Sequence, residues 1–321
     1  MDTRFTQLVG CAVPIQQAPM GAVSTPGLAL AVADAGGVGS IAAIGMPAAR
    51  LEVMLSDMAG STNGVLAANF LTNEIDRDAV AVAARLVRLV DFFWTDPDQS
   101  LVEIAHRAGA LASWQVGSLA EAKAAVDAGC DVIVVQGIEA GGHVRGTSSL
   151  LPLLAAVLDE VDIPVLASGG IGDGRSLAAV LAAGAAGARL GTRFVATHES
   201  GAHLAYKRAV VEARFAATEI TDAFAVCPLC ATSPRARVLR SCVDAVRSLD
   251  LDVIGEGSIG GQTVSLPRGS GLPPGEGFTG RIDAMAMYAG ESVHAVESIA
   301  PAATVLADLC QQAERLLAEW R

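Results

Sequence analysis

The sequence has few charged residues and no hydrophobic run long enough to cross a membrane. Only 17% of the 321 residues are charged and the mean hydropathy is +0.45, which excludes an intrinsically disordered chain. The longest apolar run, Leu177 to Ala188, stops at Arg189, short of the roughly 18 residues that a spanning helix needs. No basic segment precedes an apolar stretch near Asp2 and Arg4. We therefore expect a soluble cytoplasmic protein with no membrane partner.

Basic residues are also scarce. Lysine and arginine number 22 against 34 aspartate and glutamate residues, for a net charge of −12 and a pI of about 4.8. This balance argues against a nucleic-acid partner, because proteins that bind nucleic acid normally carry a clustered basic face. It leaves an anionic ligand open, since a site can be locally positive on an acidic protein.

Six cysteines are too few for a disulfide scaffold in a chain of this length. Cys227 and Cys230 form a CPLC pair, which has the spacing of half a zinc site or of a redox motif. No second pair exists, because Cys242 and Cys310 stand alone. We expect reduced, structural cysteines and no metal site.

The first two thirds of the chain repeat one pattern, a short apolar run followed by an Ala-rich helical stretch. Such runs indicate parallel strands covered by helices, and eight of them fit an α/β fold, the (β/α)8 TIM barrel. A doubly wound sheet is the alternative, but it leaves two strands to place at its edges. The eight runs are 14–18, 37–42, 64–69, 89–94, 110–115, 131–136, 163–168 and 186–192.

Glycines support this reading. The segments 35–37, 108–110, 128–130 and 183–185 each place a glycine between a predicted helix and the next strand, where it allows a left-handed helix cap. After Thr192 the pattern changes. We expect a long helix over 199–225, a second over 234–249, a loop or cover over 255–280 and a last helix over 292–320. The predicted domains are a barrel of residues 1–198 plus 291–321 and an insertion, 199–290, between strand 8 and helix 8 that covers the barrel mouth.

In this fold the chemistry lies at the carboxyl ends of the strands. The seventh predicted strand ends in SGGIGDG (168–174) before a helix, and Gly191 and Thr192 end the eighth. Exposed backbone N–H groups and the positive end of the helix dipole favour a phosphate at this point. The plainer alternative is a pair of tight turns that need glycine for conformation only.

His143 is the strongest candidate for chemistry, because it follows two glycines after the sixth strand and histidine titrates near neutral pH. The only lysines, Lys123 and Lys207, fall in predicted helices, which excludes a Schiff-base aldolase. Cys130 precedes its strand, at the wrong end for a nucleophile, and no metal-binding cluster converges at the strand ends. Amides such as Asn69 would suit the uncharged edge of a phosphorylated cofactor.

Five motifs in this order resemble the nitronate monooxygenase family and its relative, the flavin-dependent enoyl-acyl-carrier-protein reductase. The resemblance is strong over residues 10–200 and returns weakly at YAGES (288–292) and in the final helix. It implies a TIM barrel that binds FMN. The motifs are PIQQAPMG, AANF, VVQGIEAGGHVRG, PVLASGGIGDG and GTRF.

The same resemblance implies a set of site residues. His143 matches the family's catalytic histidine, and Arg189 departs from the glutamine common in relatives, so any role of its side chain is in question. By position, backbone around Pro19, Met20 and Gly21 would lie against the flavin, amides of Asn69 and Gln136 would bond it, and Gly141 would contact it closely. The remaining cofactor-binding residues, mostly at the phosphate, are Gly142, Ser168, Gly169, Gly170, Arg189, Leu190, Gly191 and Thr192.

The implied activity is oxidation of an alkyl nitronate by dioxygen to a carbonyl compound and nitrite, with His143 as base or as partner of the anion. Three alternatives stay open. They are an NAD(P)H-dependent flavin reductase of enoyl thioesters or quinones, a non-redox phosphate-binding barrel, and a flavin-storage module. The oligomeric state is also open, a homodimer being one assembly that the sequence allows.

Overall fold

The computed structural model describes residues 1–71, 75–226, 235–259 and 262–319. The predicted pair Cys227 and Cys230 therefore lies outside the described residues. The four cysteines that are described, Cys11, Cys130, Cys242 and Cys310, are free and buried. Within the described part of the chain, no helix combines the length and apolarity needed to cross a bilayer.

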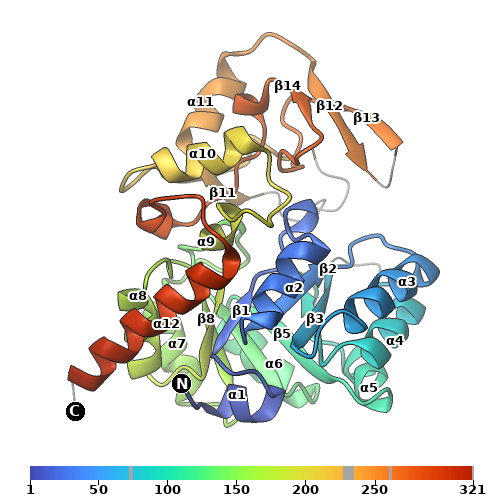
Figure 1. Ribbon diagram of the computed structural model, residues 1–321, viewed down its shortest axis with the longest axis vertical. Coiled ribbons are helices and arrows are strands. Elements are labelled where there is room, and N and C mark those ends of the chain that lie inside the picture. The colour runs from blue at the N-terminus through green and yellow to red at the C-terminus, as the bar shows by residue number, and fades with distance from the viewer. Residues whose placement is uncertain (72–74, 227–234, 260–261, 320–321) are drawn as a thin grey trace.

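Eight parallel strands close into a barrel, which confirms the predicted (β/α)8 fold (Figure 1). Neighbouring strands pair in chain order, and the last, β9, pairs with β1 through Gln16 and Arg189. Each strand falls within a run predicted to form one, give or take two residues. The strands are β1 (Ile15–Gln17), β2 (Val38–Ala42), β3 (Val65–Leu71), β4 (Leu89–Phe93), β5 (Leu111–Val116), β6 (Val132–Gln136), β8 (Val165–Ser168) and β9 (Gly187–Leu190).

Helices cover the outside of the barrel, and the chain marks where they begin and end. Thr25 caps the first of them with Pro26 in its first turn, and the four glycines predicted as caps, Gly36, Gly109, Gly129 and Gly184, all have positive φ. The helices are α2 (Pro26–Asp34), α3 (Ala48–Ala59), α4 (Arg77–Leu86), α5 (Gln99–Arg107), α6 (Leu119–Asp127), α7 (Leu150–Leu158), α8 (Gly174–Ala182) and α12 (Ala302–Glu319).

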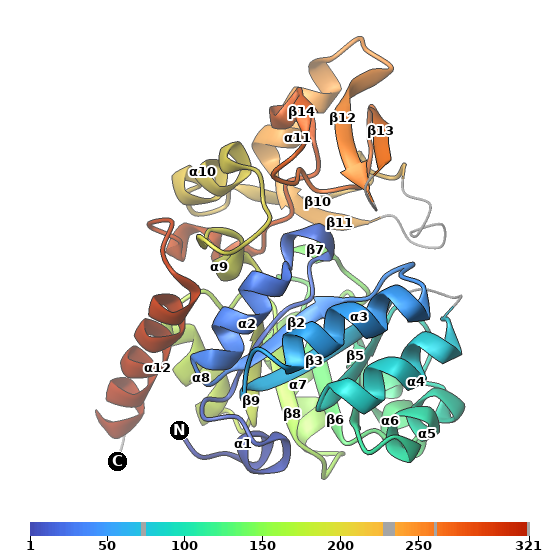
Figure 2. The ribbon, with the colours of Figure 1, turned by 45° about the vertical axis from the view of Figure 1, so that its right-hand side comes forward.

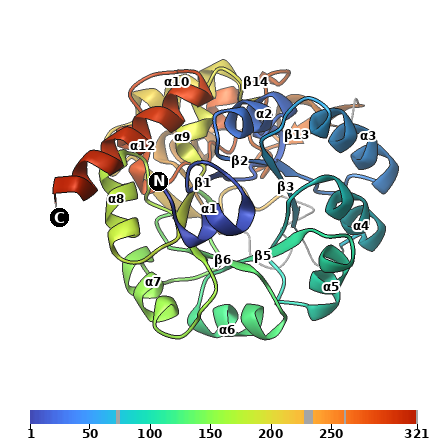
Figure 3. The same cartoon turned by 60° about the horizontal axis from the view of Figure 1, so that its bottom comes forward.

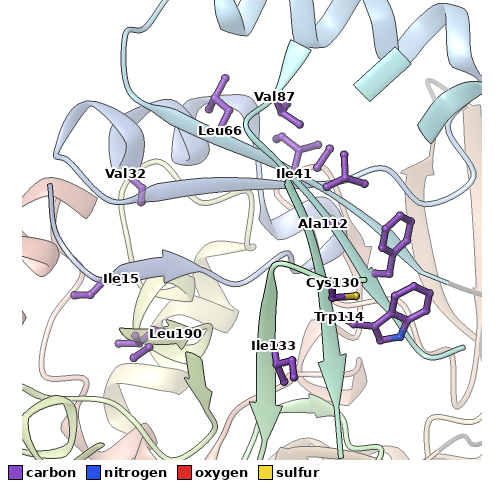
Figure 4. Packing of buried hydrophobic residues seen from close by; sticks show 14 of the residues in the cluster. Ile15, Val32, Ile41, Leu66, Val87, Ala112, Trp114, Cys130, Ile133 and Leu190 are labelled. Atoms are coloured by element: carbon purple, nitrogen blue, oxygen red, sulfur yellow. The ribbon is translucent and has the colours of Figure 1, made fainter. Parts of the chain in front are cut away.

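The barrel has an apolar floor and an apolar outer layer. Helix α1 (Arg4–Val9) lies across the amino ends of the strands and closes that end of the barrel, with Phe5 fully buried (Figure 3). Between strands and helices, side chains such as Trp114 and Ile133 form the large outer core (Figure 4). The floor and outer core leave the carboxyl ends of the strands as the place where polar groups gather.

The prediction of one long helix over 199–225 is wrong. After the short helix α9 (Thr192–Val195), the chain forms α10 (Leu204–Glu212) and then strand β10 (Thr218–Thr221). The helix ends because Ala213 is extended and Ala216 has a positive φ of 61°. The following TEIT stretch is rich in β-branched residues, which favour a strand over a helix.

The helix over 234–249 and the loop over 255–280 also need correction. Residues Ala236–Leu239 form strand β11, because they pair with β10, and only Arg240–Ser248 form helix α11. The supposed loop contains a hairpin, β12 (Val253–Ile259) with β13 (Gln262–Pro267), and strand β14 (Thr279–Gly280). Its glycines suggested a loop, yet a Cβ on Gly257 would lie 2.6 Å from the Phe278 ring, so packing demands glycine there.

The last helix begins ten residues later than predicted. A 3-10 turn, η3 (Glu291–Ala295), precedes Pro301, and α12 starts at Ala302, as a proline just before a helix favours. Two further 3-10 turns are η1 (Gly21–Val23) and η2 (Ile282–Ala284). Helices α10 and α11 and the β12–β13 hairpin lie beyond the carboxyl ends of the barrel strands (Figures 1 and 2). The domain division at 199 and 290 stays a prediction.

Candidate active site

One large pocket of about 640 Å3 opens at the carboxyl ends of the barrel strands. Every residue predicted for the site contributes to its wall, so the fold brings together residues that the chain distributes from Pro19 to Thr192. The segment after β9 adds residues that sequence reasoning did not assign, among them Tyr206 and Tyr288. The predicted residues on the wall are Pro19, Met20, Gly21, Asn69, Gln136, Gly141, Gly142, His143, Ser168, Gly169, Gly170, Arg189, Leu190, Gly191 and Thr192.

The described wall of this pocket lacks the acidic side chains that dominate the charge of the molecule. Among the described residues that line the pocket there is no aspartate or glutamate, although the chain carries a net charge of −12. Two arginines, Arg50 and Arg189, do line it. Because no described carboxylate lines the pocket itself, it suits an anionic ligand.

Backbone forms the side of the pocket that follows β8. Gly169 and Gly170 have φ values of 105° and 68°, and a Cβ on Gly169 would lie 2.9 Å from the Ala140 nitrogen. The Gly170 N–H makes no hydrogen bond to another described residue, whereas the pairing of Ser168 with Arg189 directs the Gly169 N–H toward the barrel ladder. Helix α8 was expected to add its positive end, but the Asp173 carboxylate already accepts from the Ser176 nitrogen there. The available donors are therefore loop N–H groups, which form a cradle for an oxyanion.

Arg189 does not face solvent but points into the barrel, and it is 1% exposed. Its guanidinium pairs with Asp91 at 2.5 Å and donates to Gln115 at 2.8 Å. Asp91 is fully buried and also accepts from Ser113. The Arg189 side chain is thus committed to a buried ion pair, and its backbone is paired within the barrel with Gln16 and Ser168. The one available signal for this pair was a lone carboxylate inside the apolar strand LVDFF.

Asp91 also fixes the orientation of Asn69. The Asn69 Nδ2 amide donates to the Asp91 carboxylate at 3.0 Å and to the Asp91 carbonyl at 3.3 Å. The Asn69 Oδ1 is then the atom free to meet a ligand, so this side chain can accept a hydrogen bond but has no hydrogen left to donate. If Asn69 contacts a cofactor as predicted, it therefore accepts a hydrogen bond from a donor group of that cofactor.

Gln136 holds the loop that carries His143. Its Nε2 donates to the His143 carbonyl at 2.9 Å, and its Oε1 accepts from the Arg145 nitrogen at 3.1 Å. The Arg145 side chain continues the bracing, with 2.7 Å bonds to Glu121 and Asp96. Gln136 thus bonds the histidine loop and also lines the pocket, and its hydrogen bond to a flavin stays a prediction.

The His143 imidazole lies between two aromatic rings. Its centroid is 5.6 Å from that of Trp94, nearly edge-on, and 5.7 Å from that of Tyr288. Trp94 has a φ of 83°, a strained conformation that is concentrated at functional sites. Burial lowers the pKa of His143, and no described carboxylate forms an ion pair with it to oppose that shift. The imidazole is therefore neutral at neutral pH.

The two tyrosines of the pocket act as donors, not as bases. Burial raises the pKa of both Tyr206 and Tyr288, so their hydroxyls stay protonated. The Tyr206 hydroxyl donates to the Tyr288 carbonyl at 2.5 Å, and the Tyr288 hydroxyl donates to the Gly271 carbonyl at 2.6 Å. These bonds connect the histidine's neighbour to the loop whose residues Leu272 and Pro273 also line the pocket.

Close backbone packing explains why position 141 is a glycine. A Cβ at this position would lie 2.6 Å from the Gly290 nitrogen, and a Cβ on Gly290 would lie 2.9 Å from the Glu139 carbonyl oxygen. The EAGGH and YAGES segments therefore pack backbone to backbone. Gly142 differs, since its φ is 78° and a Cβ there would meet nothing within 4 Å. It is conformation that favours glycine at Gly142.

The closed barrel and the pocket at the carboxyl ends of its strands define the class, a (β/α)8 barrel enzyme. The family model described as nitronate monooxygenase matches residues 60–312. A nitronate monooxygenase of Pseudomonas aeruginosa is 34% identical, covering 69% of this chain and 77% of the relative. The chain belongs to the nitronate monooxygenase family.

Two further comparisons bear on function. A (3aS,4S,5R,7aS)-5-hydroxy-7a-methyl-1-oxo-octahydro-1H-indene-4-carboxyl-CoA dehydrogenase of Rhodococcus jostii is 38% identical over 62% of this chain. The alignment covers 57% of that relative's length, and 63% of the enzyme of the same name from Mycobacterium tuberculosis. A solved nitroalkane oxidase of Streptomyces ansochromogenes superposes with a TM-score of 0.79 at 29% identity, covering 99% of this chain and 100% of that one.

Proposed function

We propose that this protein oxidises alkyl nitronates with dioxygen, using bound FMN, and yields a carbonyl compound and nitrite. The observation that carries the proposal is a neutral, half-buried His143 on the wall of a pocket that has no carboxylate lining and an N–H cradle on one side. The family membership and the likeness to nitronate monooxygenase and nitroalkane oxidase support the same chemistry.

The described residues fit FMN. The loop of Gly169 and Gly170 suits its phosphate, because no described residue occupies the Gly170 N–H and the two glycines leave room for a close approach. Asn69 Oδ1 suits the imide N–H of the flavin, since its own amide hydrogens are held by Asp91. Pro19 to Gly21 would lie along the ring system through their backbone. When bound, FMN supplies the redox chemistry, taking electrons from the substrate and passing them to dioxygen.

The role of His143 follows from its protonation state. A neutral imidazole can take the α-proton of a neutral nitroalkane, or donate its own N–H to an oxygen of the nitronate anion. The rings of Trp94 and Tyr288 contact the imidazole from two sides and restrict its orientation. Because the wall has no carboxylate, an anionic nitronate meets no like charge when it enters.

The test is His143→Asn, with His106→Asn as the matched control. His106 pairs with Asp131 on the exposed surface, outside the pocket. We expect His143→Asn to retain FMN and lose roughly 10²- to 10⁴-fold in turnover, the usual contribution of a general base or acid, whereas the control stays active. Anaerobic stopped-flow reduction of the flavin by a nitronate, followed by nitrite release on adding oxygen, measures this. Normal turnover in His143→Asn would contradict the assignment.

A second candidate is flavin-dependent chemistry on acyl thioesters, including NAD(P)H-dependent reduction of enoyl thioesters or of quinones. The named CoA-thioester dehydrogenases among the relatives favour it. So does the lining of the pocket, which includes the apolar side chains of Met46, Met54 and Phe278 and the cation of Arg50. Rapid anaerobic bleaching by NADH or by an acyl-CoA, with no response to nitronate, would move the protein to this branch.

A further inference from the structure

His143 belongs to two parts of the molecule at once. It lies on strand β7 (Gly142–His143), which follows barrel strand β6, yet β7 pairs with β11 from the segment after the barrel (Figure 2). In this antiparallel pair His143 is opposite Ala236, and Gly142 is opposite Arg237. The histidine loop is therefore the outer strand of a three-stranded sheet, β10-β11-β7.

The same edge of β11 also pairs with Tyr288, whose ring is the second one beside His143. Val238, two residues beyond Ala236, forms a bridge with Tyr288. Residues directly opposite in an antiparallel pair share a face, and residues two apart on a strand share a face as well. His143 and Tyr288 consequently project from one face of the sheet, which agrees with their centroid separation of 5.7 Å and their shared pocket.

Arg237 braces this sheet from its opposite face. It is 7% exposed, and its Nε and Nη2 donate to the Ile138 carbonyl at 3.2 Å and 3.0 Å. Nη2 also pairs with Glu291 at 3.0 Å. The Glu291 nitrogen in turn donates to the Glu139 carbonyl at 3.0 Å. Ile138 and Glu139 lie in the loop between β6 and β7. The buried Arg237 guanidinium therefore binds the loop that leads to His143, directly at Ile138 and through Glu291 at Glu139.

We infer that Arg237 is a positioning residue for His143. The inference deepens the proposed function and rests on the role of His143 in it. The guanidinium holds the loop from Ile138 to His143 against β11, which keeps the half-buried imidazole between Trp94 and Tyr288 and on the pocket wall. Arg237 itself does not line the pocket among the described residues, so it acts through the histidine.

The experiment compares Arg237→Met and Arg237→Lys with Arg240→Met. Arg240 lies three residues away and forms an ion pair of the same length, 3.0 Å to Glu219, but does not contact the histidine loop. The holoenzyme of each variant is titrated by NMR at the His143 ring protons, assigned by their loss in His143→Asn. FMN affinity and kcat/KM for a nitronate are measured alongside.

In Arg237→Met we expect the His143 pKa to rise toward its ordinary value of about 6.5, because a loosened loop admits water. We expect kcat/KM to fall roughly 10- to 100-fold, as for a misplaced catalytic group, with FMN affinity within about twofold of wild type. Arg237→Lys should recover part of both effects, since one donor remains. A His143 pKa and kcat/KM in Arg237→Met equal to those of Arg240→Met would overturn the inference.

A second variant and a readout that does not depend on turnover keep the test decisive. If Arg237→Met does not fold, Glu291→Gln removes the charged partner and keeps the guanidinium. A smaller rise in the His143 pKa is then expected, and an unchanged pKa would overturn the inference. The titration needs no turnover, so it separates the two proposals. A pKa rise in Arg237→Met in an enzyme indifferent to nitronates would refute the nitronate function and leave the positioning of His143 in place.

Discussion

The two sides of the pocket are built differently. The side after β8 and β9 is backbone, with loop N–H groups on glycines that belong entirely to the barrel. The side around His143 consists of side chains, and these come from both the barrel and the later segment. The first presents donors that glycine conformation sets locally. The second depends on strand β11 pairing with a loop almost a hundred residues earlier.

This contrast indicates that one side of the pocket suits the cofactor and the other side suits the substrate. A cradle of backbone N–H groups can hold a phosphate whatever the substrate is, because the cofactor does not change. The histidine side can vary with the substrate, since part of it, including Tyr288, lies on the later segment, outside the barrel ladder. Tyr288 and Gly271 illustrate this, as one hydroxyl bond links the ring beside His143 to a pocket-lining loop.

We expect the largest effect from the buried ion pair of Asp91 and Arg189 inside the barrel. Asp91→Ala leaves the buried Arg189 guanidinium without its counter-charge, which should cost about 3–5 kcal/mol of the free energy of unfolding. Denaturant unfolding at saturating FMN measures the loss. The double variant Asp91→Asn with Arg189→Gln should recover most of it. A single variant as stable as wild type would show that the ion pair does not hold the layer.

The backbone side is tested by Gly169→Ala. The alanine Cβ would meet the Ala140 nitrogen at 2.9 Å, and a φ of 105° is strained for an L-residue. At about 1.4 kcal/mol per factor of ten, we expect roughly 10- to 100-fold weaker FMN binding, measured by quenching of flavin fluorescence. Gly277→Ala is the control, because a Cβ there meets nothing within 4 Å. Equal affinity in both variants would remove Gly169 from the cradle.

The side-chain side is tested by Tyr288→Phe. This change removes the hydroxyl that donates to the Gly271 carbonyl and keeps the ring beside His143. The loss of one such bond, about 0.5–1.5 kcal/mol, should lower kcat/KM by about 2- to 10-fold. FMN affinity should be unchanged, in contrast to Gly169→Ala. Should FMN affinity fall instead, the two sides of the pocket would be less independent than the structure indicates.

The smallest effect is on pH dependence. Because burial lowers the pKa of His143, the imidazole stays neutral as the pH falls through its ordinary value of about 6.5. The acid limb of kcat/KM for a neutral nitroalkane should therefore have its midpoint below that value. A profile of anaerobic flavin reduction from about pH 5 to 8 shows it. A midpoint at or above the ordinary value would mean that His143 is solvated in the working enzyme.

The prediction from sequence succeeded where signals are local. The run 131–136 predicted β6 (Val132–Gln136) within one residue, because a buried parallel strand is a continuous apolar run. Gly36, Gly109, Gly129 and Gly184 were found as helix caps because the left-handed conformation is a property of single residues. Together these local signals determine the register of βα units and, through it, the edge at which polar residues gather.

Prediction failed where partners are distant in the chain. Arg189 stood in a phosphate motif, but its partner Asp91 is 98 positions away and only barrel closure brings the two together. Ala236–Leu239 was taken as helix because its composition allows one, and its pairing with β10 and β7 decided for a strand. Such pairings override the weak intrinsic preference of a short segment.

By itself, the sequence determined the barrel, the glycine cradle and the place of His143 at the mouth, because periodicity, caps and backbone conformation are written in adjacent residues. Only the tertiary structure decided what surrounds that histidine. The Trp94 and Tyr288 rings, the grip of Arg237 and the Asp91–Arg189 pair all join segments that are far apart in the chain. Burial and charge at the site arise from those contacts, so the low pKa of His143 is a property of the fold.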